Sequence, residues 1–281
     1  IGSVVVRVSS VEPLTGVQIH TYTATAEPSQ SCRIALQSLN SSRPTTLLVR
    51  NGTYNEQIQI GILKGSSAQH VVTFQGESGD SSAVILSAPA SANNAFTLRT
   101  QYSRFLTFKS LKIKQTANTN NYSPVFIAFG SDITFENCII EGYFGNNSSD
   151  SDAALAAFPD SNLTVRNCLI RSGGMGANLV GTGPLKYNLV FENNRVYGSY
   201  DDCLNLQKWQ NVRVRNNEFG ASSQNSLYGI YGLNLYNYEI SGNRISIFGV
   251  QATNGIYLIN CAEYNDDISL VANNSISMNL G

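Results

Sequence analysis

Two adjacent carboxylates, Asp201 and Asp202, are the residues in this sequence best suited to catalysis. They lie in the run Tyr200-Asp-Asp-Cys-Leu-Asn-Leu206. Paired carboxylates suit glycoside hydrolysis, in which one carboxylic acid protonates the leaving oxygen and another carboxylate activates water. The stretch that begins at Gly198 is equally typical of a turn. Asp201 and Asp202 are therefore catalytic candidates only if the protein is an enzyme.

Four arginines offer a second chemistry. A polysaccharide lyase uses Arg or Lys to remove a proton beside a uronate carboxylate, and Ca²⁺ commonly stabilises the resulting anion. The arginines that could line a surface near Asp202 for this purpose are Arg195, Arg213, Arg215 and Arg244. The alternative is that alternation along strands turns them outward as solvated side chains. Ca²⁺ is the only cofactor that the sequence allows, and we expect no resident metal.

Aromatic side chains near the same stretch could bind sugars. Trp209, Tyr228 and Tyr231 have flat apolar faces with a polar tip, which suits stacking on a sugar ring. The alternative is that they stack on one another inside the fold. We take these three residues as ligand-binding candidates.

Five cysteines are present, and none has a metal-ligand spacing such as CxxC. Cys138 and Cys168 fall at the same position of consecutive repeats, within reach of a disulfide. Stacking as free thiols is the alternative. A disulfide would indicate an extracellular compartment, and we expect the protein to be extracellular or at a cell surface.

The charge balance excludes several partners. The 281 residues carry a formal net charge of −1, and 13% of them are charged, so the chain lacks the basic surface of a nucleic-acid binder. No apolar run approaches the ~18 residues that a membrane-spanning helix needs. A polysaccharide or glycan is the partner that fits the candidate residues.

The elements that must position these residues come from an internal repeat. Its units are 23 to 31 residues apart. They begin with Leu106-Thr-Phe-Lys-Ser-Leu-Lys-Ile113, Ile133-Thr-Phe-Glu-Asn-Cys-Ile-Ile140 and Leu163-Thr-Val-Arg-Asn-Cys-Leu-Ile170, and they continue with units starting at Leu189, Val212, Tyr238 and Ser269. Apolar and polar residues alternate within each unit, which is the period of a strand. Repeats of this length with strand periodicity predict a β-solenoid.

The repeat predicts the coil of a parallel β-helix, with a short strand, a bend and another short strand. Stacked coils place identical side chains over one another. The bend residues Asn194, Asn217, Asn243 and Asn274 would then form a structural ladder of amides. We expect an all-β, right-handed parallel β-helix of roughly nine coils.

Two segments are predicted along the chain. Residues 1–44 form an N-terminal strand and cap, with a short helix over 29–39, and residues 45–281 form the β-helix. A cap is expected because an uncovered coil exposes unpaired strand edges. The sequence ends directly after a full repeat, which predicts continuation or self-assembly at the C-terminal end.

These repeats resemble the right-handed parallel β-helix, or pectin-lyase-like, superfamily. The run Leu47-Leu-Val-Arg-Asn-Gly-Thr-Tyr54 is similar to opening coils of pectinesterases and, more closely, of repeats in large bacterial surface proteins. Pectinesterases continue with Gln and Asp motifs, but the comparable stretch here reads Ser123-Pro-Val-Phe-Ile-Ala-Phe-Gly-Ser-Asp132. The Asp201-Asp202 run is similar to the paired-Asp motif of polygalacturonases. The Gly-His-Gly and Arg-x-Lys motifs of that family are absent.

Two classes of function follow. The first is a non-catalytic extracellular β-helix, a segment of a surface adhesin, filament or secreted structural protein that can bind glycans. The alternative is a polysaccharide lyase or glycoside hydrolase acting on an acidic polysaccharide through Asp201 and Asp202. Fold alone does not choose between them, because one scaffold can carry both.

Overall fold

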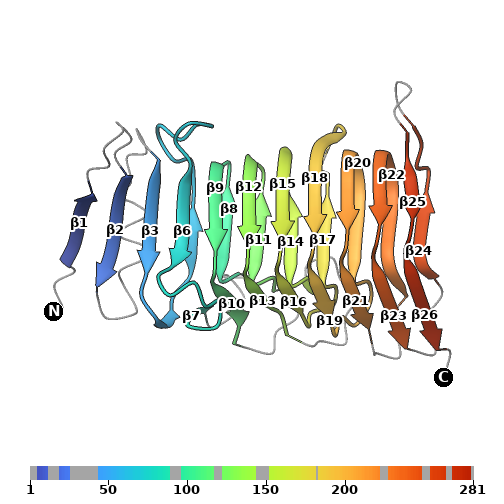
Figure 1. Cartoon of the computed structure of the whole chain (residues 1–281), viewed down its shortest axis with the longest axis horizontal. Coiled ribbons are helices and arrows are strands. Elements are labelled where there is room, and N and C mark those ends of the chain that lie inside the picture. The colour runs from blue at the N-terminus through green and yellow to red at the C-terminus, as the bar shows by residue number, and fades with distance from the viewer. Residues whose placement is uncertain are drawn as a thin grey trace.

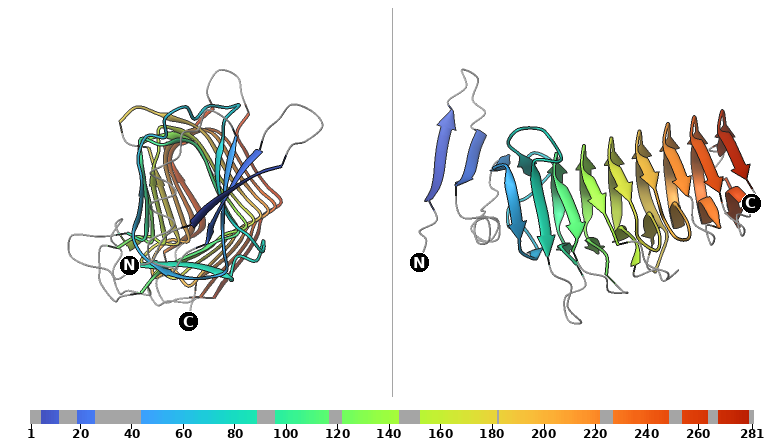
Figure 2. Two further views of the ribbon diagram at one scale, coloured as in Figure 1. Left: turned by 90° about the vertical axis from the view of Figure 1, so that its left-hand side faces the viewer. Right: turned by 90° about the horizontal axis from the view of Figure 1, so that it is seen from below.

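A computed structural model describes residues 5–11, 19–25, 44–88, 96–116, 122–143, 152–181, 183–221, 227–248, 254–263 and 268–279. The described chain winds into a parallel β-helix whose coils stack along one axis (Figure 1). The view along that axis shows each coil as a closed ring of strands and bends (Figure 2). The all-β solenoid predicted from the repeat is therefore confirmed. The helix expected over 29–39 lies outside the described residues.

Each coil contributes strands to three faces, which we call faces A, B and C in the order in which the chain visits them. Face A contains β5 (Ile58–Ile60), β8 (Leu98–Gln101), β11 (Val125–Ala128), β14 (Leu155–Phe158), β17 (Ala177–Val180), β24 (Asn254–Ile259) and the first halves of β20 (Leu204–Arg215) and β22 (Tyr228–Ser241). Face B contains β3 (Thr45–Val49), β6 (Val72–Gly76), β9 (Arg104–Lys109), β12 (Ser131–Glu136), β15 (Ser161–Arg166), β18 (Lys186–Glu192), β25 (Leu270–Ala272) and the second halves of β20 and β22.

Face C is a separate nine-stranded sheet. It consists of β4 (Gly52–Asn55), β7 (Val84–Ala88), β10 (Lys112–Gln115), β13 (Ile139–Glu141), β16 (Leu169–Arg171), β19 (Arg195–Tyr197), β21 (Glu218–Ala221), β23 (Arg244–Phe248) and β26 (Ser275–Asn279). At the N-terminal end, β1 (Val5–Val11) and β2 (Ile19–Thr25) form an antiparallel hairpin. Strand β2 then pairs in parallel with β3 and so joins the hairpin to the solenoid.

About seven coils, from β8 to β26, follow one another regularly. The coils before them are less regular, because residues 61–71 separate β5 from β6. The number of regular coils is thus slightly lower than the roughly nine predicted. The predicted register is correct, because Phe108 pairs with Phe135, Phe135 with Val165 and Val165 with Phe191.

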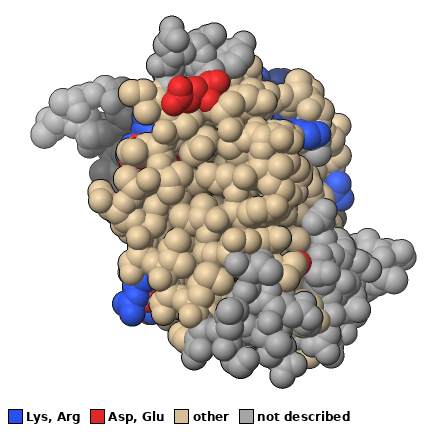
Figure 3. Space-filling view, turned by 90° about the vertical axis from the view of Figure 1, so that its right-hand side faces the viewer, with Lys and Arg blue, Asp and Glu red and all other residues tan. Residues whose placement is uncertain are grey.

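The core is the inside of the coil. The inward columns bury their side chains completely; one of them contains Phe108, Phe135, Val165, Phe191, Val214 and Ile240. In the last coil the same column ends with Val271, which is 47% exposed, because no further coil of the described chain covers it. Figure 3 looks onto this end and shows a mainly uncharged surface, with charged side chains toward the rim.

The bend between faces B and C explains the repeated Asn pairs. The first residue of each pair adopts a positive φ, for example 51° at Asn137 and 54° at Asn216. Asn tolerates this left-handed conformation better than most residues. In the coil of Asn243 the position is occupied by Gly242, at φ 66°. The second residue of each pair then points into the coil.

The inward Asn residues form a ladder of hydrogen bonds. The Asn217 amide accepts from the Asn194 backbone N–H at 2.8 Å through Oδ1 and donates to the Phe191 carbonyl at 2.8 Å through Nδ2. Asn243 repeats this arrangement, since its Oδ1 accepts from the Asn217 N–H at 2.9 Å. Asn274 continues it, and its Oδ1 accepts from the Asn243 N–H at 2.9 Å. The ladder satisfies main-chain groups that the bend would otherwise bury without partners.

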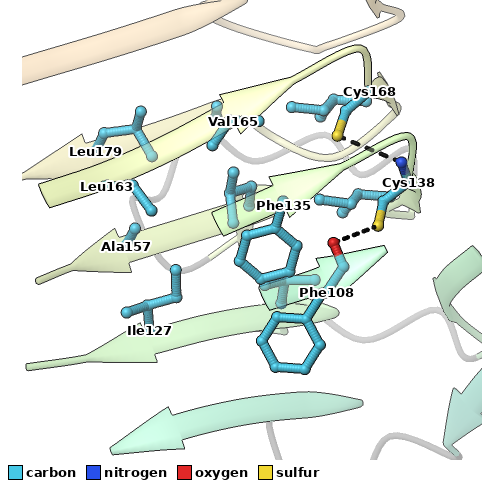
Figure 4. Packing of buried hydrophobic residues seen from close by; sticks show 14 of the residues in the cluster. Phe108, Ile127, Phe135, Cys138, Ala157, Leu163, Val165, Cys168 and Leu179 are labelled. Atoms are coloured by element: carbon cyan, nitrogen blue, oxygen red, sulfur yellow. Dashed lines mark hydrogen bonds between the residues drawn. The ribbon is translucent and has the colours of Figure 1, made fainter. Parts of the chain in front are cut away.

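Cys138 and Cys168 occupy the same column but form no disulfide, which corrects the pairing considered from the sequence. The Cys168 Sγ instead accepts from the Cys138 backbone N–H at 3.4 Å, and the Cys138 thiol donates to the Phe108 carbonyl at 3.5 Å (Figure 4). Each thiol therefore takes the place of an Asn amide in the ladder. Burial raises the pKa of Cys168 well above its usual value, so the thiol stays protonated and unreactive.

Candidate functional site

Asp201 and Asp202 lie at the bend between faces C and A, directly before β20. Their main chain continues the pairing between coils: the Asp201 N–H donates to the Gly174 carbonyl at 2.8 Å, and the Asp202 carbonyl accepts from the Gly176 N–H at 3.0 Å. The two residues are only 7% and 4% exposed. Carboxylates this far from solvent are poorly placed to exchange protons with a polymer.

Three tyrosines lie in the two coils that follow this bend. Tyr228 and Tyr231 come from β22, and Tyr257 comes from β24, where it pairs in register with Tyr231. The ring centroids of Tyr228 and Tyr257 are 5.1 Å apart at an interplanar angle of 9°, and those of Tyr228 and Tyr231 are 5.4 Å apart at 45°. We call these three residues the tyrosine cluster. It is partly exposed, with Tyr257 at 37%.

Tyr231 presents a neutral hydroxyl within the cluster. Burial raises the pKa of Tyr231, and the neighbouring Tyr228 and Asp202 raise it further. The Tyr231 phenol is consequently protonated at neutral pH and can donate a hydrogen bond. Flat rings with donor tips match the apolar face and hydroxyl rim of a sugar.

An amide strip continues the line of the cluster along the axis. Asn178, Asn205, Tyr231 and Tyr257 lie in register on β17, β20, β22 and β24. The Gln207 amide donates to Asn205 Oδ1 at 3.1 Å, and Gln207 is partly exposed. Asn178 and Asn205 are buried, at 0% and 4% exposed, so the tyrosine cluster and the Gln207 amide are the groups of this line that reach solvent.

Tyr257 was not among the residues singled out from the sequence. The signal that could have found it is the repeat itself, because Tyr228-Gly-Ile-Tyr231 and Asn254-Gly-Ile-Tyr257 occupy the same position of successive coils. The second tyrosine of the first run therefore predicts an aromatic neighbour in the second.

Trp209 does not belong to this surface, which corrects its proposed role in ligand binding. Its side chain is fully buried, and its indole Nε1–H donates to the Leu179 carbonyl at 2.9 Å. The reason is local geometry. Lys208 adopts a positive φ of 60° between the two halves of β20, and this bend turns Trp209 into the coil.

The four candidate arginines are not gathered near Asp202. Arg213 and Arg215 lie on face B, in the second half of β20, whereas Arg195 and Arg244 lie on face C, in β19 and β23. Arg195 pairs there with Glu218 at 3.5 Å. The residues considered for a lyase thus occupy separate faces of the solenoid.

Within the described parts of the chain, no three His, Cys, Asp or Glu side chains gather in a way that could hold a metal ion. Asp160 pairs with Lys186 at 3.4 Å and accepts from the Gly130 N–H at 3.0 Å. The described residues contain no helix with the length and apolar character needed to cross a membrane.

The fold and these surfaces define a right-handed parallel β-helix. The family model described as "Right handed beta helix region" matches residues 78–245, which is more than half of the chain, and the chain belongs to this family. A search of curated proteins found no match.

A solved structure shows the same fold, and a second is less similar. A pectin methylesterase from Aspergillus niger is 14% identical over 93% of this chain and 89% of its own, with a TM-score of 0.51. Pectin methylesterase PemA from Erwinia chrysanthemi is 11% identical over 86% of this chain and 88% of its own, with a TM-score of 0.44. At 14% identity, the likeness to the Aspergillus niger protein establishes similarity of fold and nothing further.

Proposed function

We propose that this chain is an extracellular, non-catalytic β-helix that binds a polysaccharide on face A through the tyrosine cluster. The observation that carries the proposal is the packing of Tyr228, Tyr231 and Tyr257 into one partly exposed aromatic surface, with the partly exposed amide of Gln207 in the preceding coil. Stacked strands repeat every ~4.8 Å, so a polymer lying along the axis would meet successive coils. A segment of an adhesin, filament or secreted structural protein would use such a surface for attachment.

Two observations favour binding over catalysis. The carboxylates of Asp201 and Asp202 are almost fully withdrawn from solvent, and the candidate arginines lie on other faces. Hydrolysis would require an exposed acid and base on either side of a sugar, and a lyase would require a base beside its substrate. Among the described residues, face A therefore offers a glycan a binding surface without exposed groups placed for turnover.

The test is affinity electrophoresis in gels containing pectic, alginate or glycosaminoglycan polymers. Pectic polymers come first, because the Aspergillus niger protein of similar fold is by name a pectin methylesterase. We expect retardation of the parent protein by at least one polymer. Replacing Tyr257, which is 37% exposed, by Ala should weaken that binding about tenfold, as truncation of a central aromatic contact typically does.

A matched control separates this site from general surface aromaticity. Tyr102 is 52% exposed and stacks on Phe129 at 5.1 Å, several coils away from the tyrosine cluster. Tyr102→Ala should leave retardation unchanged, and Tyr257→Phe, which keeps the ring, should retain most of it. Equal losses for Tyr257→Ala and Tyr102→Ala would refute the assignment of the site.

A further inference from the structure

A separate groove of about 570 Å³ lies on face B near the C-terminal end. Strands β18, β20 and β22 form its floor, and residues of the segment around β25 form one wall. The volume falls within the ~300–1,000 Å³ that is usual for small-molecule sites. Trp209, Tyr228 and Tyr231 do not line it.

Arg213 is the distinctive residue of the groove. It is exposed and lies in register between Val190 and Glu239 on the neighbouring strands. Among the described residues its guanidinium makes no salt bridge or hydrogen bond, and its positive charge helps to lower the pKa of the nearby Glu239 carboxyl. A guanidinium in this state can offer its planar pair of donors to an incoming anion.

Glu239 forms no salt bridge with Arg213, because its carboxylate oxygens already accept hydrogen bonds from other side chains. Arg215 donates to Glu239 and also pairs with Glu192 at 3.5 Å. The Ser241 hydroxyl donates to the second oxygen of Glu239 at 2.8 Å. The groove lining therefore contains two guanidinium groups and one carboxylate. That carboxylate already accepts hydrogen bonds from Arg215 and Ser241.

A column of amides lines the groove beside Arg213. Asn211 donates to Asn188 at 3.0 Å, and Asn237 donates to Asn211 at 3.4 Å. A primary amide has two donors and two acceptor sites, so an amide in this column can also bond an outside hydroxyl. Leu270, which is 44% exposed, adds an apolar contact for the carbon face of a ring.

A saccharide suits these groups better than a peptide does. A peptide strand would need unpaired main-chain edges, but β20 is paired with β18 on one side and β22 on the other. The groove offers side-chain amides, an apolar wall and a cation instead. These groups match hydroxyls, ring carbons and one carboxylate.

We propose that this groove is a second glycan site, specific for a carboxylate-bearing saccharide, with Arg213 binding the carboxylate and the amides of Asn211 and Asn237 binding hydroxyls. The site is independent of the tyrosine cluster, because it lies on a different face and shares no residue with it.

The test is calorimetric titration of the full chain with galacturonic acid oligomers, galactose oligomers of equal length, sulfated galactose oligomers and a short poly-glutamate peptide. We expect the galacturonate oligomer to bind most tightly. Arg213→Gln should weaken that binding about tenfold, equivalent to about 1.4 kcal/mol, and should leave weak binding of the neutral oligomer unchanged. All titrations should be repeated in a Tyr257→Ala background, so that binding at the tyrosine cluster does not obscure binding at the groove.

Arg244→Gln is the matched control, because Arg244 is also an exposed arginine but lies on face C. It should bind galacturonate as the parent does. Equal losses for Arg213→Gln and Arg244→Gln would overturn the proposal by showing a non-specific charge effect. Tighter binding of the sulfated oligomer or of the peptide would overturn the assignment to a carboxylated saccharide, and persistence of all binding in Arg213→Gln would overturn the role of this arginine.

Discussion

Asn217 illustrates how a single side chain holds two coils together. Its amide accepts from the Asn194 N–H at 2.8 Å and donates to the Phe191 carbonyl and to Asn243 Oδ1. The residue is 2% exposed, so water cannot take over these roles. Asn suits this column because its amide supplies both a donor and an acceptor at the length that the bend requires.

Asn217→Ala should therefore lower the free energy of unfolding by about 2–4 kcal/mol, because it leaves a buried N–H and a buried carbonyl without partners. Urea denaturation would measure the change. The control is Asn216→Gly, at an exposed position with φ 54° where Gly242 stands in the next coil. It should change stability by less than about 0.5 kcal/mol. Similar losses in both variants would contradict the account of the ladder.

On face B, positively and negatively charged residues alternate from one strand to the next. Lys109, Glu136 and Arg166 lie in register on β9, β12 and β15. Glu136 pairs with Lys109 at 3.1 Å and with Arg166 at 2.7 Å. Opposite charges on neighbouring strands support the pairing of the coils, although partly exposed pairs contribute little individually.

This column predicts a dependence of stability on pH. The Arg166 hydrogen bond lowers the pKa of Glu136 below its usual value, with Lys109 contributing in the same direction. A carboxyl with a lowered folded-state pKa contributes stability above its unfolded pKa of about 4.3, and that contribution is lost as the pH falls through the folded-state value. Glu136→Gln should therefore destabilise the protein by a few tenths of a kcal/mol at pH 7 and have no effect at pH 2–3. Urea denaturation at both pH values checks this, and equal effects at both would refute it.

Strands were predictable from the sequence where a residue column repeats. The Phe135 and Ile140 columns and the paired Asn residues established faces B and C together with their register. Short apolar runs such as 177–180 indicate the strands of face A, and the structure assigns this run to β17. The candidate site was predicted less well, because a bend with positive φ at Lys208 shifts the alternation of inward and outward residues. Trp209 points inward for this reason, although a simple count along β20 does not reveal it.

The coils of the whole molecule differ in how well they are covered. Phe135 and Ile140 of the middle coils are fully buried, whereas Val271 and Ile276 in the same columns of the last coil are each 47% exposed. In a solenoid each coil is stabilised mainly by its neighbours. The last coil has a neighbour on only one side within the described chain.

Amide hydrogen exchange should follow this arrangement. We expect the slowest exchange in β12, β15 and β18 and markedly faster exchange in β24, β25 and β26, because local opening requires less free energy where fewer apolar contacts are lost. Mass spectrometry of peptic fragments would measure the profile. Uniform protection from β12 to β26 would contradict a coil-by-coil distribution of stability.

The central claim is that face A binds a polysaccharide without altering it. The most direct measurement is incubation of the parent protein with whichever polymer retards it, followed by assays for new reducing ends and for the ultraviolet absorbance of unsaturated products. We expect binding and no product in either assay. Product formation that is abolished by Asp202→Asn, while the melting temperature stays near the parent value, would contradict it and would make the buried carboxylates of Asp201 and Asp202 the centre of an enzyme.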